Sequence, residues 1–190
     1  MTRILIFGAG LAGLQAALVL AADGHAVTVV ERDPAVPPDG AEAMYEEWER
    51  PGVSRFRMPH VASGRWSHLM ARELPEVLTE LEHLGAVRSS PLDLLPEEAI
   101  TGARAGDEEL RRVFARRPVM EGALANVTER TRGTTMRRGL TVRALRSRSG
   151  ETPRVTGVVT DTGETIDADL VIDAMGRHSP ERTCSNCCAG

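Results

Sequence analysis

The stretch from Ile4 to Arg32 limits the possible folds of this chain more than any other part of the sequence. Residues Ile4–Phe7 form an apolar run without polar alternation, which is typical of a strand covered on both faces in a parallel sheet. An alanine- and leucine-rich segment with helical spacing follows, and a second apolar run, Ala26–Val30, comes after it. This order predicts a βαβ unit and therefore an α/β fold.

Glycines interrupt the sequence where the first strand should give way to the helix. They are Gly8, Gly10 and Gly13, in the segment Gly8-Ala9-Gly10-Leu11-Ala12-Gly13. In such a segment the first glycine permits a tight turn, the second lets the backbone approach a pyrophosphate, and the third lets the helix pack closely on the strand. The helix start also directs free N–H groups and a partial positive charge toward a bound anion.

A carboxylate stands where this kind of unit recognises a ribose. Glu31 follows the second apolar run, about twenty residues after the glycines, where it can accept hydrogen bonds from both ribose hydroxyls. We therefore predict a site for an adenine dinucleotide. The negative charge disfavours a 2′-phosphate and hence NADP, whereas NAD and FAD both stay open. The alternative is a parallel α/β unit whose glycines serve packing only.

Weaker patterns predict the elements after residue 32. They are a loop over 33–39, a helix over 66–84 divided at Pro75, a helix over 118–130, a short strand over 140–145, a hairpin centred on Asp161-Thr162-Gly163 and a buried strand over 170–172. Residues 87–107 mix serine, proline and short apolar pairs and have no assignment. Small residues at 174 and 176 follow the last strand and again permit close backbone approach to a ligand, although a simple turn explains them equally well.

Composition excludes several classes of protein. The chain has 190 residues, 42% hydrophobic content and a net charge of −4, as in an ordinary globular domain. No apolar stretch is long enough for a membrane span and the N-terminus has no signal-peptide pattern, so the expected location is cytoplasmic. All 23 basic residues are arginine, but acidic residues outnumber them, which argues against a nucleic-acid partner.

The cysteines are confined to the end of the chain, at Cys184, Cys187 and Cys188. We expect residues 180–190 to be an atypical, unstructured tail, foreign to a domain that extends over residues 1–179. Together with His178 these thiols would make four zinc ligands, but their spacing matches no zinc finger. We therefore predict no metal site.

Five sequence blocks resemble the FAD-dependent oxidoreductases of the aromatic-hydroxylase type, the flavoprotein monooxygenases that include squalene-epoxidase-like enzymes and flavin halogenases. They are the glycine segment 8–13 with Ala17, Val30-Glu31-Arg32, residues 57–61 (Arg-Met-Pro-His-Val) leading to Arg65, residues 116–121 (Arg-Arg-Pro-Val-Met-Glu), and residues 169–179 from Asp169 to Ser179. Their order favours FAD over NAD. The resemblance implies a Rossmann-like FAD-binding core with a parallel sheet and an inserted β-hairpin or meander before the last parallel strand.

The same resemblance implies a set of cofactor contacts. They are Gly8, Ala9, Gly10, Leu11, Ala12 and Gly13 at the FAD pyrophosphate, Glu31 and Arg32 at the adenosine, Ala174 and Gly176 on the opposite side of the diphosphate, Arg65 near the flavin, and Val142, at the edge of the third parallel strand, beside the adenine. A permanent cation such as Arg65 can stabilise pyrophosphate or reduced-flavin charge. A solvated arginine and a plain core valine are the alternatives for Arg65 and Val142.

In this family NAD(P)H reduces the flavin, O2 is used to oxygenate a small molecule, and the protein mainly positions and shields the reacting groups. The resemblance therefore implies the FAD-binding portion of an NAD(P)H-driven, flavin-dependent monooxygenase. FAD is the expected cofactor, NAD(P)H a transient partner, and an unidentified small molecule the substrate. No catalytic side chain is predicted.

Two departures from the family pattern bear on this prediction. Met175 stands where many relatives carry threonine or aspartate, so a polar cofactor contact is missing. Nothing after Ser179 resembles the second glycine-aspartate block or the substrate sheet of the family, so we expect an incomplete domain that is open to self-association. A truncated, non-catalytic remnant that binds FAD weakly or not at all is one alternative. An NAD-binding Rossmann dehydrogenase domain is another alternative. Such an enzyme would need a catalytic Tyr-Lys or His-acid pair, but the chain has a single tyrosine, Tyr45, and no lysine.

Overall fold

The computed structural model describes residues 1–99, 102 and 104–179, and the chain divides into two compact units. The first contains residues 1–36, 49–54 and the described residues from 128 onward, and the second contains residues 37–48 and 55–127. The predicted tail at 180–190, with its three cysteines, lies outside the described residues. None of the described helices is long and apolar enough to cross a membrane.

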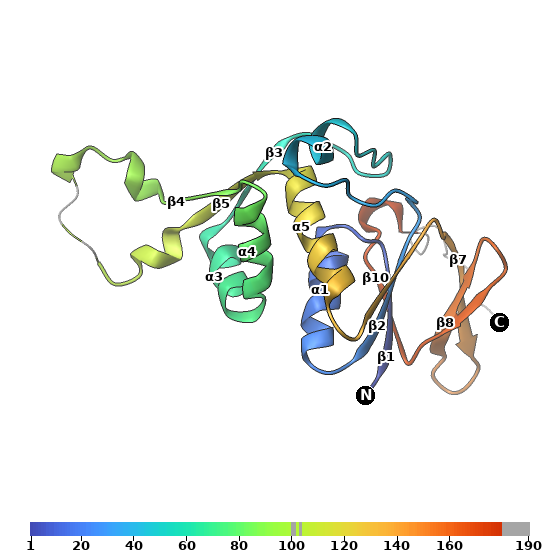
Figure 1. The fold of residues 1–190 in the computed structure, drawn as a ribbon. Coiled ribbons are helices and arrows are strands. Elements are labelled where there is room, and N and C mark those ends of the chain that lie inside the picture. Colours follow the sequence, from blue (N-terminus) through green and yellow to red (C-terminus); the bar gives the residue numbers. More distant parts are fainter. Residues whose placement is uncertain (100–101, 103, 180–190) are drawn as a thin grey trace. The chain divides into compact units, whose positions relative to one another are not determined.

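A four-stranded parallel sheet forms the centre of the first unit (Figure 1). Its strands are β1 (Arg3–Phe7), β2 (Ala26–Glu31), β6 (Thr134–Arg138) and β10 (Leu170–Asp173), in the order β10-β1-β2-β6. On β1, Ile6 lies opposite Val29 on one side and Ile172 on the other. The apolar run of β1 is buried, as expected for a central parallel strand, and the predicted α/β, Rossmann-like fold class is confirmed.

Helix α1 (Leu11–Ala22) connects β1 to β2 and packs against the parallel sheet (Figure 1). It buries Leu14, Ala17 and Leu18. The helix closes at Gly24, which has a φ of 83° that favours glycine, while the N–H of His25 donates to the carbonyl of Leu20. This closure turns the chain directly into β2.

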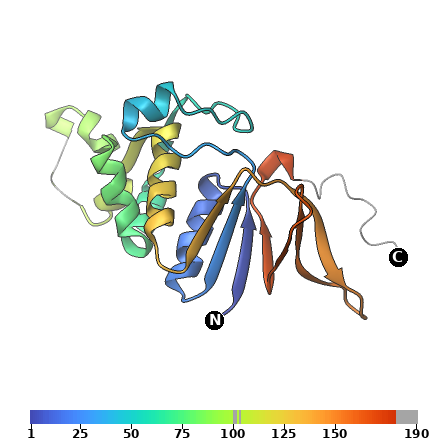
Figure 2. The same ribbon diagram turned by 45° about the vertical axis from the view of Figure 1, so that its right-hand side comes forward.

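The predicted meander before the last parallel strand is a three-stranded antiparallel sheet (Figure 2). Its strands are β7 (Val142–Arg148), β8 (Arg154–Thr160) and β9 (Thr165–Asp167). β8 and β9 form the predicted hairpin, in which the N–H of Gly163 donates to the carbonyl of Thr160. The inserted hairpin or meander is therefore confirmed.

One hydrophobic cluster joins the meander to the parallel sheet. Its buried members are Leu5, Phe7, Val30, Val142, Val158 and Ala168. Since side chains alternate along a strand, Leu5 and Phe7 share one face of β1, and the meander packs on that face. The prediction that Val142 lies at the edge of the third parallel strand is wrong: that strand is β6, and Val142 begins β7 opposite Thr160, where it is a core valine.

The second unit combines helices with a small antiparallel sheet of order β3-β5-β4. Its elements are α2 (Ala41–Glu46), β3 (Pro59–Ala62), α3 (Gly64–Glu73), α4 (Pro75–His83), β4 (Val87–Ser89), β5 (Arg112–Arg116), most of α5 (Arg117–Arg130), and 3-10 turns η1 (Pro91–Leu94), η2 (Glu97–Ala99) and η3 (Asp107–Leu110). A further 3-10 turn, η4 (Gly176–His178), follows β10 in the first unit.

The helices predicted over 66–84 and 118–130 are both confirmed. The segment over 66–84 forms α3 and α4, and Pro75 divides them by beginning α4, where the missing N–H of proline is tolerated. Ser63 caps α3 by accepting a hydrogen bond of 3.2 Å from the N–H of Trp66. The helix predicted over 118–130 is α5, which begins one residue earlier. The sequence does not predict β5, because Val113 and Phe114 are a single apolar pair among arginines.

Arg3 and Asp169 join the start of β1 to the start of β10. The carboxylate of Asp169 accepts hydrogen bonds from the backbone N–H of Arg3 at 2.9 Å and from its guanidinium at 3.0 Å. In return, the N–H of Asp169 donates to the carbonyl of Arg3 at 2.8 Å. The hydrogen bond from the Arg3 side chain, followed by that from its backbone, lowers the pKa of the Asp169 carboxyl to about 2.

We expect Arg3→Gln to raise the pKa of Asp169 from about 2 toward its ordinary value, because the charged donor is lost while the backbone donor stays. A folded-state pKa below the unfolded one means that Asp169 stabilises the fold above an unfolded pKa of about 3.9, and that this contribution is lost as the pH falls toward the folded pKa. Carboxyl NMR titration of both proteins measures the shift. An Asp169 pKa that is the same in both would contradict the assignment.

Candidate functional site

Two of the glycines after β1 are needed because the backbone around them is too close for a side chain. Gly8 has a φ of 106°, and a Cβ there would lie 2.8 Å from the backbone carbon and oxygen of Ala174. At Gly13 a Cβ would lie only 2.0 Å from the carbonyl oxygen of Gly8. The end of β1, the first turn of α1 and the residue after β10 are therefore in direct backbone contact.

Gly10 differs from the other two glycines, because a Cβ at this position would meet nothing within 4 Å. Gly10 is the N-cap of α1, and no side chain caps the helix there. The first turn of α1 also contains no acidic residue. The helix start thus presents backbone N–H groups and a partial positive charge to an open space, which is the arrangement that binds phosphate groups.

Gly13 and Gly10 should respond differently to replacement by alanine. We expect Gly13→Ala to destabilise the first unit by about 1–3 kcal/mol through overlap with the Gly8 carbonyl, although alanine is the better helix former. Gly10→Ala should cost less than about 1 kcal/mol, because the added methyl meets open space. Urea unfolding of the two variants measures the difference, and equal costs would contradict this account of the loop.

Glu31, predicted as the ribose ligand, points toward the glycine loop and is 3% exposed. Its Oε2 accepts a hydrogen bond of 2.7 Å from the N–H of Ala9, and its Oε1 accepts one of 3.0 Å from the N–H of Asp33. The carboxylate therefore connects the end of β2 to the loop between Gly8 and Gly10. In this structure Glu31 fixes the backbone of the glycine loop through the N–H of Ala9.

Arg50 is a member of the site that the sequence analysis did not identify. Its guanidinium donates to Glu31 at 2.9 Å, to Asp33 at 2.9 Å and to the carbonyl of Ala9 at 3.2 Å. The side chain is 3% exposed, so this is a buried charge network of one cation and two carboxylates. A lone arginine in an irregular segment carries no sequence signal for such a role; only the acid pair at 31 and 33 indicates that a buried cation is needed.

Loss of the Arg50 side chain should be costly because two carboxylates would lose their buried cation. We expect Arg50→Ala to lower the free energy of unfolding by about 3–5 kcal/mol. The control is Arg132→Ala, an exposed arginine of the same unit, which should change it by less than about 0.5 kcal/mol. Urea unfolding measures both variants, and similar losses in the two would show that the Arg50 network contributes little.

A small cavity of about 60 Å³ lies beside the glycine loop. Of the predicted site residues it is lined by Gly8, Gly10, Glu31, Arg32 and Ala174, and it is also lined by Asp33, Arg50, Gly52 and Met175. Arg32 lies over Gly52, where a Cβ would be 1.7 Å from its Nη2. The cavity holds roughly two waters, so a larger ligand must extend over the open side at Gly10.

The remaining predicted residues have separate positions. Leu11 and Ala12 form the first turn of α1, and Gly176 begins η4 with a φ of 59°. Val142 belongs to the hydrophobic cluster, and Arg65 is exposed on the first turn of α3, in the second unit. Cofactor contacts of Arg65, Val142 and Gly176 stay predictions. At Met175 the backbone N–H donates to Asp173 at 2.8 Å.

Comparison with known proteins places this geometry in a family. Residues 3–186 match the model of the family described as FAD binding domain. No curated protein sequence matches the chain. The fold is similar to the crystal structure of FqzB, with a TM-score of 0.65 and 21% identity over 96% of this chain and 37% of that chain. It is also similar to PqsL, "a probable FAD-dependent monooxygenase from Pseudomonas aeruginosa", with a TM-score of 0.59 and 15% identity over 90% of this chain and 41% of that chain. A 2-methyl-3-hydroxypyridine-5-carboxylic acid oxygenase variant gives a TM-score of 0.56 and 18% identity over 90% of this chain and 38% of that chain.

The chain thus spans about two fifths of the length of these three structures. At these identities the likeness concerns the fold alone. What the matched proteins bind or catalyse is a property of those proteins.

Proposed function

The chain belongs to the FAD binding domain family, and on that premise we propose that it binds FAD as the cofactor portion of a flavin-dependent monooxygenase. The observation that carries the proposal is the open space above Gly10 at the uncapped start of α1. Gly8 and Gly13 have no room for a Cβ, so the loop is held in one conformation with its backbone exposed to the ligand.

The residues around the loop fit the diphosphate and adenosine parts of FAD. The N–H groups at the start of α1 would hold the pyrophosphate, with Ala174 close by on the side of β10. Arg32, which is predicted to contact the adenine side, lines the same cavity as Gly10. The backbone of Ala174 leaves no room for a Cβ at Gly8, and its own methyl group lies close to the position that a Cβ at Gly13 would take.

Glu31 would bind the ribose in a way that the sequence alone does not suggest. Its Oε2 already accepts hydrogen bonds from Ala9 and Arg50, and its Oε1 from Asp33. A carboxylate has about four lone-pair sites, so a ribose hydroxyl can be added without breaking this network. The guanidinium of Arg50 lies 2.9 Å from Oε2 of Glu31 and supplies the buried carboxylate with a cation partner.

The chemistry of the proposed reaction belongs to the flavin, which can take up electrons from NAD(P)H and react with O2. The described residues of this chain bind and orient the cofactor, and we assign no side chain as a general acid, base or nucleophile. The substrate would be a small molecule, and its contacts lie outside the site built from the glycine loop.

We expect the purified chain to retain FAD, with the absorbance of a bound flavin and quenched fluorescence, and to bind NAD more weakly. Gly10→Ala should weaken FAD binding by at least about tenfold, because its methyl group enters the space where the diphosphate approaches the backbone. Fluorescence titration with FAD measures the affinity, and urea unfolding verifies that the variant is folded.

The matched control is Gly150→Ala in the β7–β8 turn, where a Cβ would make an ordinary contact of 3.6 Å with the carbonyl oxygen of Thr152. FAD affinity should be unchanged in this variant. Retention of NAD equal to or better than that of FAD would reject the flavin assignment. An unchanged FAD affinity in folded Gly10→Ala would reject the proposed position of the diphosphate.

A further inference from the structure

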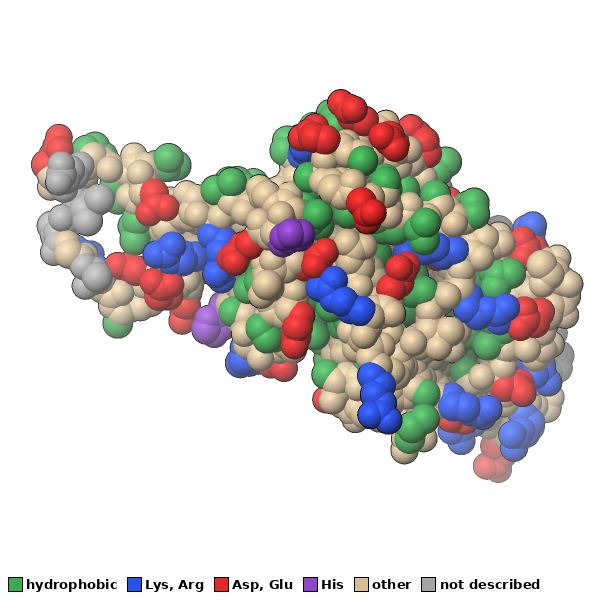
Figure 3. Space-filling view, in the orientation of Figure 1, with side chains coloured by type: hydrophobic (Ala, Val, Ile, Leu, Met, Phe, Trp, Pro, Cys, Tyr) green, Lys and Arg blue, Asp and Glu red, His purple; other side chains and the backbone are tan. Residues whose placement is uncertain are grey.

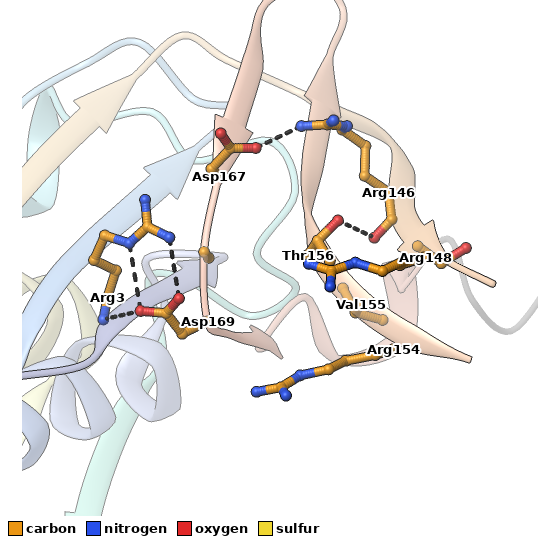
Figure 4. A pocket seen from close by; sticks show the side chains of 10 residues that line it. Arg3, Arg146, Arg148, Arg154, Val155, Thr156, Asp167 and Asp169 are labelled. Atoms are coloured by element: carbon orange, nitrogen blue, oxygen red, sulfur yellow. Dashed lines mark hydrogen bonds and ion pairs between the residues drawn. The ribbon is translucent and has the colours of Figure 1, made fainter. Parts of the chain in front are cut away.

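The first unit contains a second, larger cleft between the N-terminal end of the parallel sheet and the meander (Figure 4). Its volume is about 550 Å³, within the range of small-molecule sites. The charged residues that line it are Arg3, Arg146, Arg148, Arg154, Asp167 and Asp169. Arginine side chains are also visible over the β7 and β8 part of the surface in Figure 3.

This cleft is distinct from the glycine loop. Arg3 is the first residue of β1, whereas Gly8 follows the last residue of the same strand. Five residues of extended chain separate them by roughly 16 Å. No residue that lines the small cavity at Gly8 also lines the larger cleft. A ligand of the larger cleft would therefore be a different one from the dinucleotide.

Two of the four arginines in the cleft have acidic partners. Arg3 forms an ion pair with Asp169 at 3.0 Å, and Arg146 pairs with Asp167. Within residues 1–99, 102 and 104–179, no carboxylate forms an ion pair with Arg148 or Arg154. Figure 4 shows the latter two side chains extending from the hairpin into the cleft, on the side where Arg3 and Asp169 lie. The charge of Arg154 also acts on the Asp169 carboxylate and helps to lower its pKa, but the four arginines and two aspartates that line the cleft still leave a net charge of +2.

The strand register brings these two charges together. Arg148 of β7 and Arg154 of β8 are direct partners across the antiparallel ladder. Like charges directly opposite each other destabilise a sheet, so the fold alone gives no reason for this pair. The register shifts next to Arg146, where Arg146 faces Gly157 and Ser147 faces Val155. Thr156 therefore has no residue opposite it on β7, and it lines the cleft. A bound anion would offset the repulsion.

The geometry points to a binding site for a diphosphate group in this cleft, carried by inorganic pyrophosphate or by a nucleoside diphosphate. Each guanidinium presents a planar set of donors that matches the oxygens of one phosphate, so Arg148 and Arg154 together suit two linked phosphates. Thr156, whose hydroxyl donates weakly to the carbonyl of Arg146 at 3.4 Å, offers a further donor beside them.

The experiment is isothermal titration of the FAD-saturated chain with inorganic pyrophosphate, with ADP, and with sulfate at matched ionic strength. FAD occupies the glycine loop, so binding there does not obscure the result. We expect one pyrophosphate or ADP per chain, bound more tightly than sulfate. In Arg148→Gln/Arg154→Gln, the affinity should fall by at least about tenfold, because both charge-assisted contacts are lost.

The control is Arg132→Gln/Arg143→Gln, which removes the same charge at exposed arginines outside the cleft and should leave the affinity unchanged. No binding beyond that of sulfate, or an equal loss in both double variants, would overturn the proposal. Tighter binding of ADP than of pyrophosphate identifies a nucleotide ligand, and the reverse order identifies the inorganic ion. If the chain does not bind FAD, the titration is made without it, and binding that survives in Arg148→Gln/Arg154→Gln again overturns the proposal.

Discussion

The backbone contact between Gly8, Gly13 and Ala174 is the constraint on which the rest of the site depends. These three residues belong to the end of β1, the first turn of α1 and the residue after β10, and their packing leaves no room for a Cβ at either glycine. The contact fixes the direction of the α1 start relative to the sheet. It also brings the carboxyl ends of neighbouring parallel strands together, where open α/β sheets bind their ligands. Gly10 lies between these two tightly packed glycines, and a Cβ there would meet open space.

Buried charge is the second constraint. Glu31 and Asp33 are both buried near the end of β2, and a buried carboxylate needs a cation or several donors. Arg50 supplies the cation from a segment distant in sequence and also binds the carbonyl of Ala9. The glycine loop is thus held by a carboxylate through its N–H and by a guanidinium through its carbonyl. This network prepares the loop before any ligand arrives, which lowers the entropy cost of binding.

The parallel strands differ in how well the sequence predicts them, and the presence of an apolar run is the reason. β1 and β2 carry apolar runs and are largely buried, so their pattern is visible in the sequence. β10 also carries an apolar run, but it is an edge strand and Leu170 is 47% exposed, so the strand predicted over 170–172 is present but not fully buried. β6 is an edge strand of threonine, methionine and arginine. Its Arg137 and Arg138 pair with Glu164 and Glu129, which lie far away in the sequence or in another element. Without knowledge of these partners the segment has no strand signal, and the third parallel strand is placed wrongly at Val142.

By itself, the sequence determined the strand-glycine-helix-strand unit and the acid at Glu31, because the absence of a Cβ and the pattern of apolar residues are local properties. It also determined the hairpin around Gly163 and the division of a helix at Pro75, for the same reason. Only the tertiary structure decided that Arg50 belongs to the site and that Arg148 and Arg154 face one cleft. Arg50 reaches Glu31 through contacts between segments distant in the sequence, and the register of the β7–β8 hairpin sets Arg148 opposite Arg154.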